Sequence, residues 1–305
     1  MSKLRVTHPF LYAVVIFLIF GFTMQLASLV ATMVFTVAFG NEPIVESAST
    51  LFGEIAAGLV LCAVLRGAGR GCLLTKKGRG FVPGLAIGGY CFVFFAFVAC
   101  EEIVELMSAG AFSINLAPAS AVCVLSMLAV GVTEEIEARA LIGETFLEHF
   151  GTTRDGALRA AVASGLIFGL MHITNAIDAP FWDTVSQVIL CFTGGILYGV
   201  IYFRGGNLWS IALIHGLNDV FASLDTWLVN GGASPAMVDT GFSAIALAVT
   251  LLVGALDIAV SLYLLRKDRA GEVAKTWPEI SESGGWATGE PAAALDAAPE
   301  RPEGL

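Results

Sequence analysis

The sequence predicts an all-α, polytopic membrane protein: an eight-helix transmembrane bundle followed by a disordered C-terminal tail. The chain is 56% hydrophobic and only 14% charged, with a mean hydropathy of +0.80, whereas soluble domains carry about 25% charged residues. Long apolar runs alternate with short polar loops, as expected for helices that cross a bilayer. The sequence has no basic stripe of the kind that binds nucleic acid, so no nucleic-acid partner is expected. The apolar runs predict that the lipid bilayer surrounds the chain.

Each of the eight expected spans is an apolar run of membrane-crossing length, and the third and fourth are each expected as one helix. In chain order the spans cover residues 10–39, 48–65, 81–106, 119–150, 157–176, 184–203, 208–228 and 241–265. Lysine and arginine precede the first span and follow the second, fourth, sixth and eighth. The positive-inside rule then predicts that both termini are cytoplasmic, in what we expect to be a bacterial plasma membrane.

The chain divides into a membrane domain over residues 1–266 and a tail over residues 267–305. The tail is rich in Ala, Gly, Pro and Glu and shows no apolar periodicity, which predicts disorder. Trp277 and Trp286 are expected to be ordinary tail residues.

The stretch GVTEEIEARA inside the fourth span carries most of the charge expected within the membrane. A charged side chain at the bilayer centre costs about 2.5–3.5 kcal/mol on insertion scales, so such residues are paired, face water or do chemistry. Glu135 and Arg139 are spaced i, i+4 and are expected to pair on one helical face. Glu134 then has no obvious local partner, and Glu137 is expected to be solvated or to face a vestibule.

Two further i, i+4 motifs lie in later spans: Phe168 with His172, and His215 with Asp219, beside Asn218. A carboxylate near a histidine can take a proton from water as a general base. A second histidine, oriented by a carboxylate or an amide, can donate to the oxyanion of a tetrahedral intermediate. The three motifs together therefore predict a site that activates water.

Taken singly, these residues have plainer interpretations. The Glu135–Arg139 pair alone favours a structural role, and Phe168 favours packing. A lone membrane histidine is often a hydrogen-bonded helix linker, and a lone Glu134 would suit a proton relay in a transporter. The occurrence of all three motifs on different spans favours the catalytic interpretation.

The motifs EExxxR, FxxxH and HxxxN/D in successive apolar segments resemble the CPBP intramembrane protease family. This family includes the CAAX prenyl proteases and the Abi bacteriocin-processing and self-immunity proteins. The resemblance covers about residues 125–224, and the expected span count is similar to that of the family.

The resemblance implies a role for each matched position. Glu134 corresponds to the proposed general base and His172 to the histidine that positions the water. His215 and Asp219 correspond to the pair assigned to oxyanion stabilisation, although many members carry Asn at the last position. The supporting positions are Glu135, Arg139 and Phe168.

A glutamic mechanism without metal or other cofactor is the favoured expectation. Glu134, His172 and His215 could instead ligate zinc, but HExxH is absent. The six cysteines include no CxxC, so neither a thiolate zinc site nor a disulfide framework is expected.

The sequence therefore predicts an intramembrane endopeptidase, with a chamber that opens to the cytoplasm. Its expected substrate is a peptide precursor or a membrane-associated protein. Two alternatives stay open: a non-catalytic, immunity-type protein that binds a peptide or partner, and a proton-coupled transporter.

Overall fold

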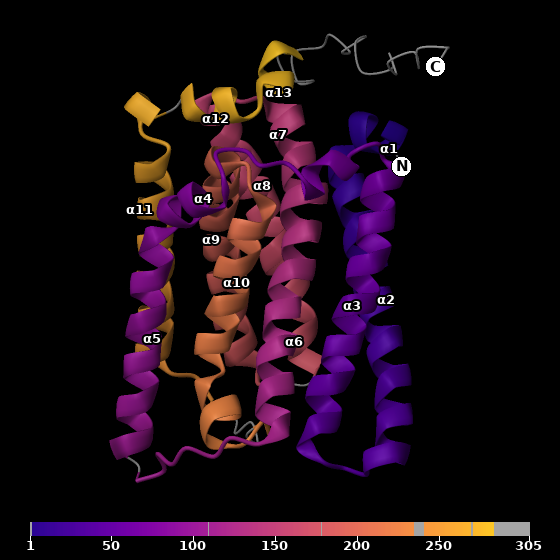
Figure 1. Cartoon of the computed structure of the whole chain (residues 1–305). Helices are drawn as coiled ribbons and strands as arrows, with labels where there is room; N and C mark the ends of the chain where they lie inside the picture. The colour runs from indigo at the N-terminus through magenta and orange to yellow at the C-terminus, as the bar shows by residue number, and fades with distance from the viewer. Residues whose placement is uncertain (1, 109, 178, 235–240, 270, 284–305) are drawn as a thin grey trace.

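The computed structural model describes residues 2–108, 110–177, 179–234, 241–269 and 271–283, and no strand occurs within these ranges. The predicted all-α class is confirmed (Figure 1). The α-helices are α1 (Ser2–Thr7), α2 (Pro9–Phe39), α3 (Pro43–Gly67), α4 (Phe81–Ile87), α5 (Gly89–Ser108), α6 (Pro118–Glu135), α7 (Glu144–Phe150), α8 (Arg154–Met171), α9 (Phe181–Gly205), α10 (Leu208–Ala222), α11 (Ala244–Leu264), α12 (Gly271–Thr276) and α13 (Pro278–Ser283). The remaining segments are the 3₁₀-helices η1 (Gly71–Leu74), η3 (His172–Ile177) and η5 (Lys267–Arg269), and the π-helices η2 (Ile136–Gly143) and η4 (Asp225–Val229).

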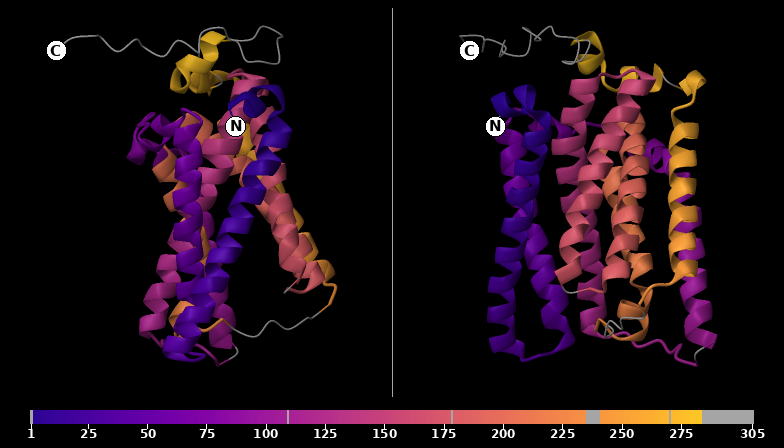
Figure 2. Two further views of the ribbon diagram at one scale, coloured as in Figure 1. Left: turned by 90° about the vertical axis from the view of Figure 1, so that its right-hand side faces the viewer. Right: turned by 180° about the vertical axis from the view of Figure 1, so that it is seen from behind.

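The long helices stand roughly side by side and run alternately between the two ends of the bundle (Figures 1 and 2). Among the residues that the structure describes, six helices are long and apolar enough to cross a membrane, and the bent pair α4–α5 makes seven if it counts as one span. The eighth expected span is represented by α10, which has only 15 residues. The chain is thus an integral, multi-pass membrane protein, with a helix count close to the expected eight.

Local sequence accounts for where several helices begin. Proline occupies the first turn of α2, α3 and α6, where its missing N–H costs no intrahelical hydrogen bond. Side chains cap α8 and α10: Thr153 accepts from the backbone N–H of Gly156, and Asn207 from that of Ser210. These caps satisfy N–H groups that a helix leaves unpaired at its start.

Two expected helices are not continuous. The third span bends by 63° between α4 and α5, at Gly88, which has no side chain to restrain the backbone. The fourth span changes at Ile136 into the π-helix η2 and returns to α-helix at Glu144. Apolar periodicity shows neither feature, because both are local changes inside one long apolar run.

Helix packing is tightest in three groups. Helices α8 and α9 pack along each other, as do α2 and α3, while α6 packs against both α3 and α10. Helix α11 covers the outer side of α9. The shared core therefore lies around η2, whose eight residues are all buried.

Buried ion pairs fix the N-terminal helix to this core. Arg5 on α1 and Arg70 in the following loop both pair with Glu144 and Glu148 on α7. All four side chains are largely buried. Because buried charges are stable only when paired, the short leader is part of the fold.

Part of the segment expected to be a disordered tail is folded, because α12 and α13 dock on the end of the bundle where α9 ends (Figure 1). Trp277, expected to be an ordinary tail residue, is fully buried and its Nε1–H donates to the carbonyl of Phe203 at 2.8 Å. The Lys76 ammonium lies 3.8 Å from the centre of its ring. Residues 284–305, including Trp286, lie outside the described residues.

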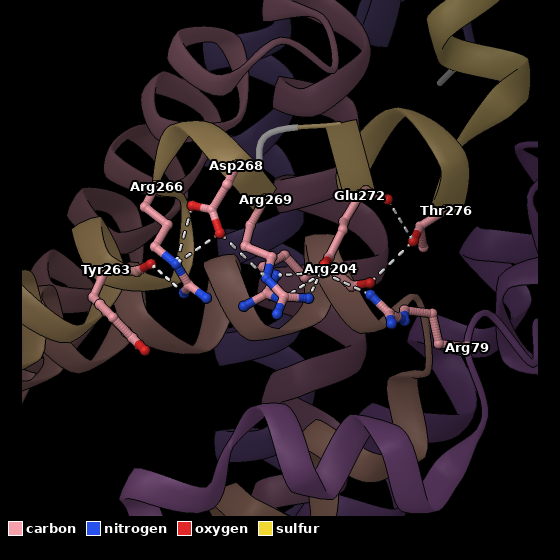
Figure 3. Close-up of polar contacts among 8 residues, drawn as sticks. All are labelled: Arg79, Arg204, Tyr263, Arg266, Asp268, Arg269, Glu272 and Thr276. Atoms are coloured by element: carbon pink, nitrogen blue, oxygen red, sulfur yellow. Dashed lines mark hydrogen bonds and ion pairs between the residues drawn. The ribbon is translucent and has the colours of Figure 1, made fainter.

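Glu272 on α12 anchors this segment (Figure 3). Its carboxylate contacts Arg204 at 2.5 Å, Arg79 at 2.6 Å and Arg269 at 2.7 Å. Burial alone would raise the pKa of Glu272, but hydrogen bonds from Arg269 and Arg204, with the charges of Arg204 and Arg79, lower it to about 2. The carboxylate is therefore ionised at neutral pH and links three parts of the chain.

Candidate active site

The candidate site lies where α6 passes into η2, beside the middle of α10. Glu135 is fully buried, whereas the neighbouring Glu134 side chain is 14% exposed. The π-helix lets one more residue fit into its wide turn, which rotates the residues that follow by about 100° relative to a regular α-helix. Such segments are frequent at functional sites.

His215 is held by a buried carboxylate. Its Nδ1 lies 2.9 Å from Oε1 of Glu135, whose Oε2 accepts from Nε of Arg139 at 2.8 Å. The expected Glu135–Arg139 ion pair is therefore present, and it extends to a third side chain. A carboxylate on Nδ1 fixes the orientation of an imidazole and assigns that nitrogen as a donor.

The other ring nitrogen of His215 faces two acids. Its Nε2 lies 3.7 Å from Oε2 of Glu134 and 3.7 Å from Oδ2 of Asp219. Both distances exceed a hydrogen bond, as is common at catalytic sites without substrate. Asn218 donates to the other oxygen of Asp219 at 3.3 Å, so it orients this acid.

A close helix crossing brings these groups together. Gly131 on α6 lies directly against Gly216 on α10, and a Cβ on Gly131 would overlap the backbone nitrogen of Gly216. Small residues at such crossings allow two backbones to approach closely. The crossing lies one turn from Glu134 and next to His215, so it sets their separation.

Phe168 links the second histidine to the first. Its ring centre lies 5.0 Å from that of His172 and 5.7 Å from that of His215, and the Arg139 guanidinium lies 5.4 Å from it. Nδ1 of His172 lies 2.9 Å from the carbonyl of Phe168. His172 also interacts electrostatically with Asp219. All seven residues singled out from the sequence therefore belong to one region.

Three further buried residues lie beside this region, and Glu54 and Tyr198 among them were not predicted. Glu54 on α3 is 2% exposed, interacts electrostatically with Glu134, and its carbonyl accepts from the Thr133 hydroxyl at 3.1 Å. Glu137 is fully buried and neither carboxylate oxygen has a hydrogen-bond partner among the described residues, so both positions expected for it, solvated or facing a vestibule, are wrong. Tyr198 packs against His215, with ring centres 5.4 Å apart. A carboxyl inside an apolar span was a usable signal for Glu54.

Within the described ranges, no three His, Cys, Asp or Glu side chains are arranged to hold a metal ion. Of the three candidate ligands, Glu134 lies 3.7 Å from Nε2 of His215, and the rings of both histidines pack against Phe168. A mechanism without metal stays a prediction.

A comparison with known protein families finds a match for one part of the chain. Residues 115–221 match a family described as type II CAAX prenyl endopeptidase Rce1-like. This segment, about a third of the chain, is similar to Rce1-like domains. The match confirms the resemblance and is consistent with the CPBP intramembrane proteases. No curated protein and no solved structure matches the chain.

The matched segment extends from just before α6 to the end of α10. It contains Glu134, His172, His215 and Asp219, together with η2 and the glycine crossing. Glu54 lies outside it, on α3. The matched segment thus coincides with the region where the membrane-embedded acids and histidines gather, and the family description names an endopeptidase.

Proposed function

We propose that the chain is an intramembrane endopeptidase in which Glu134 activates water to hydrolyse a peptide bond. The observation that carries this proposal is the convergence of Glu134 and Asp219 on Nε2 of His215, while Glu135 and Arg139 hold its Nδ1. The Rce1-like match supports the reaction class. The proposed substrate is a peptide precursor or a membrane-associated protein.

Each group has a distinct part in the proposed reaction. Glu134, the partly exposed acid, takes the proton from water as it attacks the scissile carbonyl. His172 donates Nδ1–H to the Phe168 carbonyl, which leaves Nε2 to accept a hydrogen bond from the attacking water. His215, protonated between the acids, donates Nε2–H to the oxyanion. Glu134 then passes its proton to the leaving amine.

Asp219 is assigned to orienting His215 and balancing its charge. An ionised carboxylate cannot donate to an oxyanion, so this role differs from that of the Asn found in many family members. Glu135 and Arg139 are assigned as positioning residues. Their opposite charges compensate each other, and both side chains are fully buried, away from the exposed face of the site.

The test compares cells that express the native chain with cells that express Glu134→Gln at matched levels. Mass spectrometry of membrane and medium fractions would search for peptide termini that depend on Glu134. Such termini support hydrolysis and identify the substrate. Identical termini in both cells, with a phenotype that persists in the variant, would overturn the proposal in favour of a binding role.

A further inference from the structure

The two ends of the bundle differ in charge. Every described lysine and arginine except Arg139 lies at the end where α2 begins and α9 ends. The opposite end carries acids, namely Glu42, Glu46, Glu101, Glu102, Glu105, Asp183 and Asp225. Membrane proteins concentrate lysine and arginine in cytoplasmic loops. The basic end is therefore the cytoplasmic one.

The site is closed towards this basic end. Between Glu134 and that end, η2 and α7 are buried, with Arg139, Leu141 and Phe146 at 0–2% exposure. Facing parts of α9 and α10 are equally buried, as at Val200 and Ile211. Helices α12 and α13 add a further layer over the end of α9.

Towards the acidic end the packing opens. Helices α8 and α9 meet η2 and α4 near the basic end and then diverge from α2, α3 and α6 (Figure 2, left). On α10, Leu217, Asn218 and Asp219 are only partly buried, whereas Ile214 and His215, which precede them, are buried. Helices α6 and α10 stay in contact at Gly131, so the divergence lies on the α8 and α9 side of the site.

Polar side chains continue from the site along this open side. Asp219, 21% exposed, lies one turn beyond His215 in the direction of the acidic end. His172 is partly exposed, and Thr174 and Asn175 beyond it are exposed. Asn175 donates to Gln187 on α9 at 2.9 Å. Polar groups at the ends of α8 and α9 thus connect the site with the acidic end.

We infer that substrate reaches Glu134 from the acidic, extracytoplasmic end. This inference rests on the proposed endopeptidase function and names its substrate class: a peptide segment exposed on the outer face of the membrane. It is opposite to the cytoplasmic opening expected from the sequence. A polypeptide that ends in the cytoplasm would have to pass the buried layer formed by η2, α7 and α9.

Cysteine accessibility tests the direction without requiring cleavage. The native Cys72 is exposed at the basic end and serves as an internal reporter. Asn218→Cys places a thiol in the site, and Asn175→Cys places one near the end of α8. Intact cells would be treated with a membrane-impermeant maleimide, with and without permeabilisation, and mass spectrometry would identify the labelled cysteines.

The expected result is labelling of both introduced cysteines in intact cells, with Cys72 labelled only after permeabilisation. Labelling of Asn218→Cys from the same side as Cys72, or from neither side, would overturn the inference. The exposed Asn175→Cys keeps the test valid if a substitution in the site disturbs folding. A chain that is labelled as expected but yields no Glu134-dependent termini would refute the endopeptidase proposal alone.

Discussion

At the scale of single residues, the site depends on one buried chain of charges: Arg139, Glu135 and His215. Removing one member leaves an uncompensated charge in the core, at a cost of about 3–5 kcal/mol. We therefore predict that Arg139→Met lowers the free energy of unfolding in detergent by this amount. It would also release Nδ1 of His215 from its fixed orientation.

Glu137→Gln is the matched control, because Glu137 is equally buried on the same π-helix but has no hydrogen-bond partner among the described residues. Replacing an unpartnered buried acid by a neutral amide is expected to be neutral or stabilising. Denaturant or thermal unfolding of both variants provides the comparison. Equal losses would show that the Arg139–Glu135 pair has no special role.

Asp219 gives a second prediction at this scale. Asp219→Asn keeps an oxygen near Nε2 of His215, 3.7 Å away in the native chain, and matches the residue found in many family members. It should retain activity within about tenfold, whereas Asp219→Leu should lose about 10²–10³-fold, the effect of removing one oriented polar group. Cleavage rates of the two variants on a Glu134-dependent substrate test this prediction. Equal activity of both variants would remove Asp219 from the mechanism.

Residue spacing in the sequence is sufficient to predict the Glu135–Arg139 pair, because i, i+4 contacts are local. It cannot predict that Glu135 also holds His215, or that Glu54 approaches from α3. Those contacts depend on how separate helices pack. The burial of Glu137 has the same origin, since η2 is enclosed on all sides.

At the scale of secondary-structure elements, the crossing of α6 and α10 determines the site geometry. Gly131→Ala would force the two backbones apart, because its Cβ overlaps Gly216. Displacements of about 1 Å in an active site can cost about 10²-fold in rate. We predict a loss of this order in kcat/KM, with the chain still folded and inserted.

Gly194→Ala on α9 is the control for this substitution, since the nearest atom to its Cβ is Oδ2 of Asp257 at 3.9 Å. Its helix propensity change is the same, but it needs no backbone shift. Activity of both variants would be measured on one substrate. A loss in Gly194→Ala as large as that in Gly131→Ala would contradict a role for the crossing.

The docked segment α12–α13 gives a prediction about charge. Glu272→Gln removes the anion that contacts three arginines, and we expect α12 to undock more often. Loss of about 1 kcal/mol corresponds to about fivefold faster trypsin cleavage in the linker at Lys267 and Arg269. Glu282→Gln, exposed on α13, is the control. Equal cleavage in both variants would refute this role.

The contact between Glu272 and the three arginines also makes the docking of α12 depend on pH. The pKa of Glu272 is lowered from 4.5 to about 2, so its contribution to docking is complete above about pH 4.5. It is lost as the pH falls towards 2, when the carboxylate is protonated. The loss should therefore be smaller in Glu272→Gln than in the native chain, where Glu279 paired with Lys76 adds a second acid-sensitive contact. Trypsin cleavage at Lys267 and Arg269 across this pH range, followed by mass spectrometry, measures it.

These elements show the limit of sequence patterns. Apolar runs and charged loops locate the helices, but the bend at Gly88 and the π-helix leave the apolar pattern unchanged. The segment 271–283 looks like tail because its few apolar residues, Val273, Trp277 and Ile280, are buried only against α9 and the basic loop. Short docked helices of this kind depend on tertiary contacts.

At the scale of the whole molecule, charge separates the two ends while burial separates the two approaches to the site. The separation of charge can be predicted from the sequence, because lysine and arginine occur in alternate loops. The difference in burial cannot be predicted in this way, since the divergence of α8 and α9 from α6 arises from packing near η2. The sequence therefore predicts the alternation of basic loops and the motifs that the fold brings together, whereas the unequal burial on the two sides of the site depends on packing.

The measurement that tests the account most directly is cleavage of an identified substrate by the purified chain, with Glu134→Gln as the variant and Glu105→Gln, exposed far from the site, as the control. A general base contributes about 10²–10⁴-fold, so Glu134→Gln should lose at least this much in kcat/KM while its unfolding midpoint is unchanged. Glu105→Gln should retain native activity. Activity of Glu134→Gln within tenfold of native would contradict water activation by Glu134.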